Sequence, residues 1–120
     1  MSAPVVEWQI VTPDPEGVAS FYKAVFKWEV QANNSLAYRQ VGTGVAGMRG
    51  GIWPAPPGVS SFVQLFISVP IVADALARAV EHGATVVVPE TTLPDGATMA
   101  VLHDPAGMSF GLLESRSSVR

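Results

Sequence analysis

The chain has 120 residues, a formal net charge of −3 and no cysteine, and 48% of its residues are hydrophobic. This length and hydrophobic content suit one domain with one core, and the lack of cysteine excludes disulfides, thiolate nucleophiles and cysteine-based zinc sites. No cluster of Lys or Arg could follow a phosphate backbone, so nucleic acid is not an expected partner. No apolar run approaches the roughly twenty residues of a membrane span, and no basic segment leads into one, so we expect a cytoplasmic protein without membrane contact.

The first half of the sequence predicts a strand, a helix and three shorter strands. Residues 5–12 are rich in β-branched and aromatic side chains and stop at Pro13, as a strand before a turn does. Asp14 can cap the helix that Pro15 begins. Apolar residues then recur at helical spacing and are predicted to face the core: Val18, Phe21, Tyr22 and Val25. Shorter strands are predicted within residues 27–31, 36–41 and 44–50.

The second half repeats this order after a proline-rich crossing at residues 51–59, which lacks periodicity. A strand ends at Pro70, and a helix follows that ends at His82 and Gly83. Its predicted core stripe is Val72, Ala75, Leu76, Ala79 and Val80, and three further strands lie within residues 85–90, 97–103 and 108–114. A shift of about 57 positions lays the first half on the second. Module one is therefore placed at about 4–50, module two at about 60–115 and a tail at 116–120.

This duplicated β-α-β-β-β order, with "ASFYKAVFKW" after the first strand and "DPAGMSFGLLE" near the end, resembles the vicinal oxygen chelate superfamily. That superfamily includes glyoxalase I, bleomycin-resistance proteins and extradiol dioxygenases. The resemblance covers nearly the whole chain and implies a single α+β domain in which two βαβββ modules form a curled eight-stranded cup, with helices outside and a ligand inside. It also implies a homodimer, which would cover exposed strand edges. It does not select an activity, because this scaffold hosts several chemistries and simple sequestration.

Strand alternation assigns faces independently of the family. On the first strand of module two, one face is aliphatic and is predicted to pack under a helix, whereas the other suits a small-molecule site: Phe62, Gln64, Phe66 and Ser68. The aliphatic face consists of Val63, Leu65, Ile67 and Val69. On the first strand of the chain, Val6, Trp8 and Ile10 are predicted to face the helix, with Glu7, Gln9 and Val11 opposite. Glu7 and Gln9 could instead simply face solvent.

The resemblance also implies where a metal would bind. Metal-dependent members take ligands from the first and fourth strands of each half, and these positions fall on Glu7, Gly47, Gln64 and Gly111. The two glycines offer no donor atom, and two oxygens do not normally hold a divalent cation against water. We therefore expect no metal and no cofactor.

The two histidines have competing interpretations. His82 lies in the last helical turn, where a cation favourably meets the helix dipole. His103 precedes Asp104 and Pro105, so it could cap that turn or point into the cup and act as an acid or base with Glu7.

The predicted function is binding of a small apolar or aromatic molecule in a metal-free cup. The protein either sequesters this molecule or acts on it by acid/base chemistry through Glu7, as a metal-free isomerase, lyase or hydrolase. Trp53 is a candidate aromatic lid, and Arg49 could meet an anionic group or lie at a solvated strand end. Gly47 and Gly111 would let a ligand approach the backbone. The alternative is a divalent-metal-dependent lyase or dioxygenase with unusual ligands.

Overall fold

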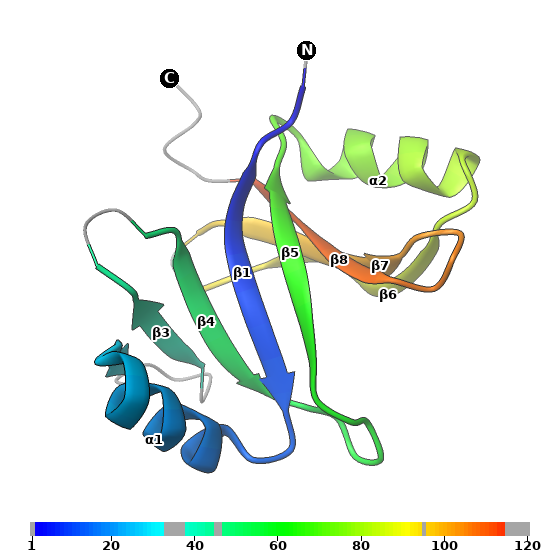
Figure 1. Cartoon of the computed structure of the whole chain (residues 1–120). Coiled ribbons are helices and arrows are strands. Elements are labelled where there is room, and N and C mark those ends of the chain that lie inside the picture. Colours follow the sequence, from blue (N-terminus) through cyan, green and yellow to red (C-terminus); the bar gives the residue numbers. More distant parts are fainter. Residues whose placement is uncertain (1, 33–37, 45–46, 95, 115–120) are drawn as a thin grey trace. The chain divides into compact units, whose positions relative to one another are not determined.

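The computed structural model describes residues 2–32, 38–44, 47–94 and 96–114, so the predicted tail lies outside the described residues. The elements follow the order β1 (Val5–Thr12), α1 (Pro15–Phe26), β2 (Glu29–Gln31), β3 (Arg39–Gly42), β4 (Arg49–Pro54), β5 (Phe62–Ser68), α2 (Val72–Glu81), β6 (Thr85–Thr92), β7 (Thr98–His103) and β8 (Ser109–Glu114) (Figure 1). The strands are hydrogen-bonded in the order β2-β3-β4-β1-β5-β8-β7-β6. The predicted α+β class with two βαβββ modules is therefore confirmed.

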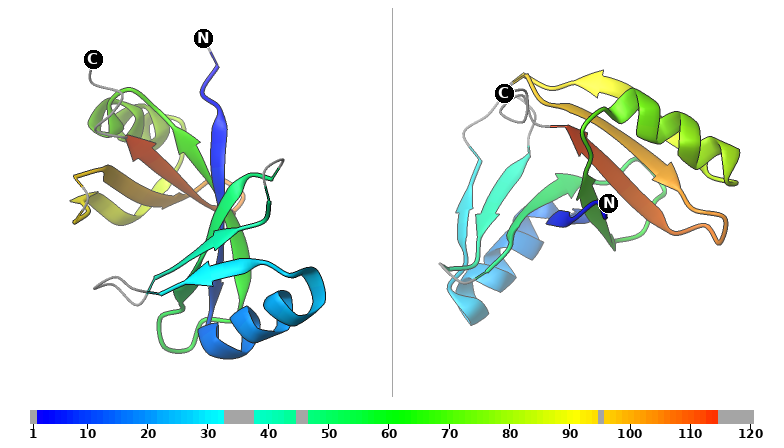
Figure 2. Two further views of the ribbon diagram at one scale, coloured as in Figure 1. Left: turned by 90° about the vertical axis from the view of Figure 1, so that its left-hand side faces the viewer. Right: turned by 90° about the horizontal axis from the view of Figure 1, so that it is seen from above.

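The chain divides into two compact units, one of residues 7–64 and the other of residues 1–6 with 65–120. In the 7–64 unit, α1 packs against β2 and β4 (Figure 2). The core of this unit is built on Ala19, Val41 and Ile52, and Trp8 and Ile10 of β1 pack against it, as strand alternation predicts. The side chains of Glu7 and Gln9 consequently leave β1 on the face opposite this core.

Helix α1 begins where the sequence predicts. Asp14 caps it by accepting a hydrogen bond of 3.0 Å from the backbone N–H of Gly17, and Pro15 occupies the first turn. Phe21 and Val25 were predicted to be buried, and this is wrong, because 54% and 51% of their surfaces are exposed. The helix approaches the sheet through the small side chain of Ala19, which leaves these two residues on its outer flank.

Helix α2 packs in the other unit on a core of Val72, Ala100, Leu102 and Leu112. Its predicted stripe is confirmed apart from Val80, which is 47% exposed. The aliphatic face predicted for β5 is only half right. Ile67 and Val69 pack against this core, whereas Val63 and Leu65 are 55% and 47% exposed. The core under α2 therefore contacts only the C-terminal end of the aliphatic face.

Strand β4 extends into the predicted crossing. It pairs in parallel with β1, from Glu7 opposite Arg49 to Thr12 opposite Pro54, so Trp53 is a strand residue and not a loop residue. Proline is tolerated there because it ends the strand. Gly47, predicted within the fourth strand, lies before β4 in a turn closed by a 3.0 Å hydrogen bond from its N–H to the carbonyl of Gly44. The first error arises because a glycine- and proline-rich segment was interpreted as irregular, and the second because the fourth strand was placed too early in the sequence.

Neither helix in the described ranges has both the length and the apolar character needed to cross a membrane.

Candidate functional site

A hydrogen-bonded polar cluster lies in the 7–64 unit, and we call it the Glu7 cluster: Glu7, Gln9, Tyr38 and Gln64. The Tyr38 hydroxyl donates to Glu7 Oε2 over 2.8 Å. The Gln64 side-chain amide donates to Gln9 Oε1 over 3.1 Å. Gln9 and Gln64 are only 5% and 6% exposed, so Gln9 does not face solvent, and Glu7 is half-buried. Buried amides of this kind need partners, and here they supply each other.

Tyr38 can reach Glu7 because the residue of β4 that its ring covers, Gly51, has no side chain. A Cβ at Gly51 would collide with the Tyr38 hydroxyl and ring carbons. On the other side, the Tyr38 ring packs against Trp53, with ring centroids 4.7 Å apart and planes at 33°. Glycine at position 51 is therefore required for a close approach of the aromatic ring to the backbone.

The electrostatics of the cluster keep Tyr38 protonated. Burial raises the pKa of the Tyr38 phenol well above its ordinary value, and the charge of Glu7 and the hydrogen bond to it raise this pKa further. A hydrogen bond with Gln9 and the charge of Arg49 act in the opposite direction but do not cancel the effect. At neutral pH the phenol is uncharged, and its hydroxyl donates a hydrogen bond to the Glu7 carboxylate.

The strand register identifies the fourth-strand positions. Phe66 lies opposite Gly111 in the β5–β8 pair, and Gln9 lies opposite Gly51 in the β1–β4 pair. The 57-residue shift relates Gln9 to Phe66, so Gly51 and not Gly47 is the counterpart of Gly111. The Phe66 ring covers Gly111 as Tyr38 covers Gly51. The space expected at Gly111 is therefore filled by the Phe66 ring, and Tyr38 fills the corresponding space at Gly51, where no site residue was predicted.

The donor set does not fit the metal that the family resemblance implies. Glu7 and Gln64 already bond to Tyr38 and Gln9, and both fourth-strand positions lack a side chain. Within the described ranges, no group of three or more His, Asp or Glu residues is placed to hold an ion. A cation at Glu7 would have to displace the Tyr38 hydrogen bond and find further donors.

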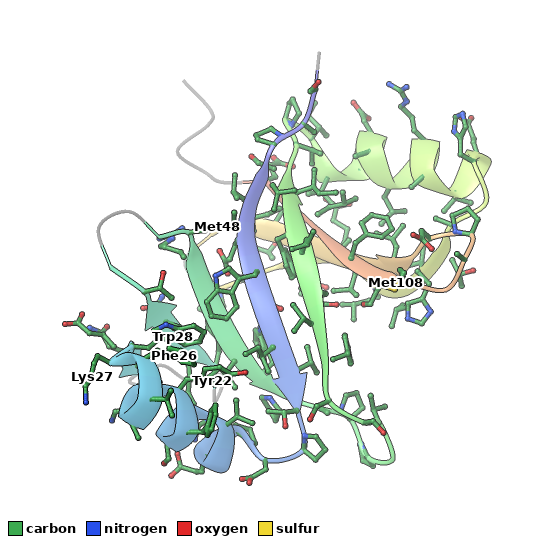
Figure 3. All side chains as sticks on the ribbon, in the orientation of Figure 1. Tyr22, Phe26, Lys27, Trp28, Met48 and Met108 are labelled. Carbon is green, nitrogen blue, oxygen red and sulfur yellow. The ribbon has the colours of Figure 1, made fainter. Side chains whose placement is uncertain are left out.

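The other predicted site residues are distributed over both units. Arg49 is exposed and lies opposite Glu7 on β4, and Phe62 is half-buried at the start of β5. His103 is exposed at the end of β7. The turn after it is capped by Asp104, which accepts hydrogen bonds from the N–H groups of Ala106 and Met108 over 2.8 and 3.0 Å (Met108 is labelled in Figure 3). The structure thus brings Glu7, Gln9, Gln64 and Trp53 together, and it pairs Phe66 with Gly111, but His103 belongs to the other unit.

Tyr38 is not among the site residues predicted from the sequence. The available signal was strand alternation, because Tyr38 shares a face with Gln40, and Gln40 lies opposite Gly51. Val41 on the other face is in the core. A polar aromatic residue on the face opposite the core, next to a strand glycine, indicates a side chain that covers that glycine.

The duplicated modules and the Glu7 cluster define a small domain of the glyoxalase and bleomycin-resistance type. The profile described as Glyoxalase-like domain matches residues 6–113, and the chain belongs to this family. It is 28% identical over 111 residues, or 88% of its length, to proteins of Mycobacterium bovis and Mycobacterium tuberculosis that carry the provisional name glyoxylase CFP32. The chain spans 42% of the length of these relatives.

Solved structures show the same fold at low identity. A hypothetical protein from Bacillus halodurans matches with a TM-score of 0.70 and 14% identity, covering 97% of this chain and 96% of that one. A Streptomyces coelicolor methylmalonyl-CoA epimerase variant in complex with 2-nitronate-propionyl-CoA matches with 0.63 and 18%, covering 96% and 99%. A glyoxalase/bleomycin resistance protein/dioxygenase superfamily member from Vibrio splendidus matches with 0.65 and 15%, covering 95% and 100%. At these identities the matches establish a shared fold.

Proposed function

We propose that this protein binds a small, partly apolar or aromatic molecule at the Glu7 cluster without a metal, and that Glu7 carries a proton in the reaction. The observation that supports this most directly is the 2.8 Å hydrogen bond from the Tyr38 hydroxyl to Glu7 Oε2 beside the Trp53 ring. It combines an oriented carboxylate with an aromatic surface, and these are the two features that a small-molecule site of this kind needs.

The chemistry follows from which oxygen of Glu7 is engaged. Oε2 accepts from Tyr38, whereas no described residue donates to Oε1. Oε1 is thus the oxygen that can take a proton from a bound molecule and return it at another position, as an isomerase or lyase requires. Trp53 offers the ligand an apolar face, and Arg49 on the adjacent strand offers a cation for an anionic group.

Sequestration without reaction is the second candidate. It is favoured by the hydrogen bond from Gln64 to Gln9, which engages these buried amides within the protein. A pure binding protein would return its ligand unchanged, whereas an enzyme would release product.

The test is a panel of small apolar, aromatic and carbonyl compounds screened by thermal shift, because a ligand of the folded state raises the unfolding temperature by mass action. Each stabilising compound is then incubated with the protein and analysed by mass spectrometry and NMR. We expect Glu7→Gln to reduce turnover by at least about a hundredfold, the scale of a lost general base. The exposed Glu90→Gln variant is the matched control. Equal turnover by Glu7→Gln and the parent protein would remove the proton-carrier role.

The remaining sequence-based expectations extend this proposal. Phe62 stays a proposed ligand contact in the 7–64 unit. The roles predicted from the sequence for Phe66 as a ligand contact and for His103 as an acid or base stay predictions, whereas the Phe66 ring covers Gly111. A cytoplasmic location without nucleic-acid partners also stays a prediction. A homodimer is supported by the places of β2 and β6 at the two ends of the strand order, where an edge is open to pairing. Val86 and Val87 of β6 are 37% and 49% exposed. Light scattering on the purified chain should give a mass of two chains.

A further inference from the structure

We infer that Tyr38 is a positioning residue for Glu7, and that Gly51 is present to admit it. The inference rests on the proposed function only in assigning a reaction to Glu7. The hydrogen bond and the need for glycine can be tested without any ligand.

Tyr38 is held by two residues of β4. Its ring contacts the Trp53 ring, and both its ring and its hydroxyl cover Gly51. Because any β-carbon at position 51 would overlap both the hydroxyl and the ring, Tyr38 can occupy this place only while residue 51 is glycine.

The Tyr38 hydroxyl orients the Glu7 carboxylate. By donating to Oε2 it restrains the Glu7 carboxylate, and Oε1 has no donor among the described residues. Glu7 is half-buried, so the hydrogen bond replaces part of its lost hydration. A carboxylate without this partner could rotate, and its two oxygens would become equivalent.

The chain contains a second glycine covered by an aromatic ring. Gly111 is the register counterpart of Gly51, and it is covered by Phe66, a ring without a hydroxyl. A phenyl ring therefore suffices to fill such a space. The hydroxyl of Tyr38 serves the contact to Glu7 and is not needed for packing, so Tyr38→Phe should fold normally.

The experiment is NMR of protein labelled with ¹³C at the ζ carbon of tyrosine. The chain has two tyrosines, so Tyr22 is an internal reference. We expect Tyr38 to ionise at higher pH than Tyr22, and Glu7→Gln to lower the Tyr38 midpoint by about one pH unit, the scale of one charge-assisted hydrogen bond. Tyr22 should not move. A Tyr38 midpoint equal to that of Tyr22, or unchanged by Glu7→Gln, would overturn the inference.

Gly51→Ala tests the role of the glycine. We expect it to expel Tyr38, so that its midpoint falls toward that of Tyr22 and no longer responds to Glu7→Gln. Gly42→Ala is the matched control, since a Cβ there meets nothing within 4 Å. A Tyr38 midpoint that stays high in Gly51→Ala would show that the glycine is not required.

A second measurement at neutral pH avoids alkaline conditions. In a double-mutant cycle of Glu7→Gln and Tyr38→Phe, the urea midpoint of the double variant should fall by less than the sum of the two single shifts. Additive shifts would contradict a direct contact. If coupling is present but no compound binds, the proposed function fails and the positioning role stands. If a ligand is turned over without coupling, the reverse holds.

Discussion

Gly111 lies on β8 opposite Phe66 of β5, and the Phe66 ring covers the space that a β-carbon at this position would need. Both residues are buried, so the ring has little room to move away. We expect Gly111→Ala to lower the free energy of unfolding by about 1–3 kcal/mol, the usual cost of overpacking. Urea denaturation checks this. Adding Phe66→Leu should restore part of the loss, and a Gly111→Ala protein as stable as the parent would contradict the packing.

Tyr38 also predicts how stability depends on pH. Its pKa is raised in the folded protein, chiefly by burial and then by Glu7, whereas the unfolded phenol ionises near its ordinary value of about 10. The unfolded chain therefore loses this proton first as the pH rises, and ionisation pulls the equilibrium toward unfolding. The stability associated with the protonated phenol is complete below about pH 10 and declines above it.

Comparing urea midpoints between pH 8 and 11 for the parent and Tyr38→Phe measures this effect. The parent should lose stability more steeply than the variant in the upper part of the range. All other ionisable groups are the same in both proteins and cancel in the comparison, and Tyr22→Phe should keep the steep slope of the parent. Parallel curves for the parent and Tyr38→Phe would be inconsistent with a raised pKa.

At the residue scale, the sequence predicted the members of the site better than its contacts. Alternation placed Glu7 and Gln9 on the face away from the core, and it placed Gln64 opposite the aliphatic face of β5. It could not show that Tyr38 lies against Gly51, because that contact joins residues on neighbouring strands and depends on the β3–β4 register. An absent side chain was interpreted as empty space, whereas a neighbouring ring fills it.

At the scale of elements, the N-terminus of helix α2 is capped by a side chain of strand β8. Ile71 at its N-cap offers no side-chain hydrogen bond, and the first helical N–H, that of Val72, donates to Glu114 Oε1 of β8 over 2.8 Å. The carboxylate also lies at the positive end of the helix dipole. We expect Glu114→Ala to cost about 1–2 kcal/mol, as loss of an N-cap does.

Chemical denaturation measures the effect of Glu114→Ala, with Glu90→Ala on exposed β6 as the control that removes the same charge. The Glu114 variant should also show faster amide exchange at Val72. If both glutamates cost the same, the effect would come from net charge and the contact between α2 and β8 would have no special value.

The elements were predicted well where local chemistry sets them. Asp14 and Pro15 determine where α1 begins, and turn residues separate β6, β7 and β8. The prediction failed for β4, because its strand state comes from parallel pairing with β1, and parallel pairing is not visible in a local pattern. Glycines at 50 and 51 resemble loop residues in the sequence, yet they receive the Trp8 and Tyr38 rings.

At the scale of the whole chain, the two modules have kept their strand order but not the same side chains at equivalent positions. Glu7 in module one corresponds to Gln64 in module two, and Gln9 corresponds to Phe66. The ring that covers the fourth-strand glycine comes from Tyr38, just before β3, in module one and from Phe66 of β5 in module two. The carboxylate of Glu7 and the hydroxyl of Tyr38 thus both belong to module one. A metal held symmetrically by both modules would need equivalent donors in each, and this chain does not supply them.

This distribution of donors predicts that the folded chain takes up no stoichiometric divalent ion. Protein purified without chelators should contain far less than one equivalent of zinc, nickel, manganese or iron by elemental analysis. Because an ion that binds only the folded state would stabilise it, adding each metal or EDTA should leave the thermal unfolding temperature unchanged. Gly51→Glu combined with Tyr38→Ala supplies a third carboxylate or amide oxygen beside Glu7 and Gln64, and is the variant most able to gain metal-dependent stability. One equivalent of bound metal in the parent, lost in Glu7→Ala, would instead show that Glu7 is a ligand and that Tyr38 yields to the ion.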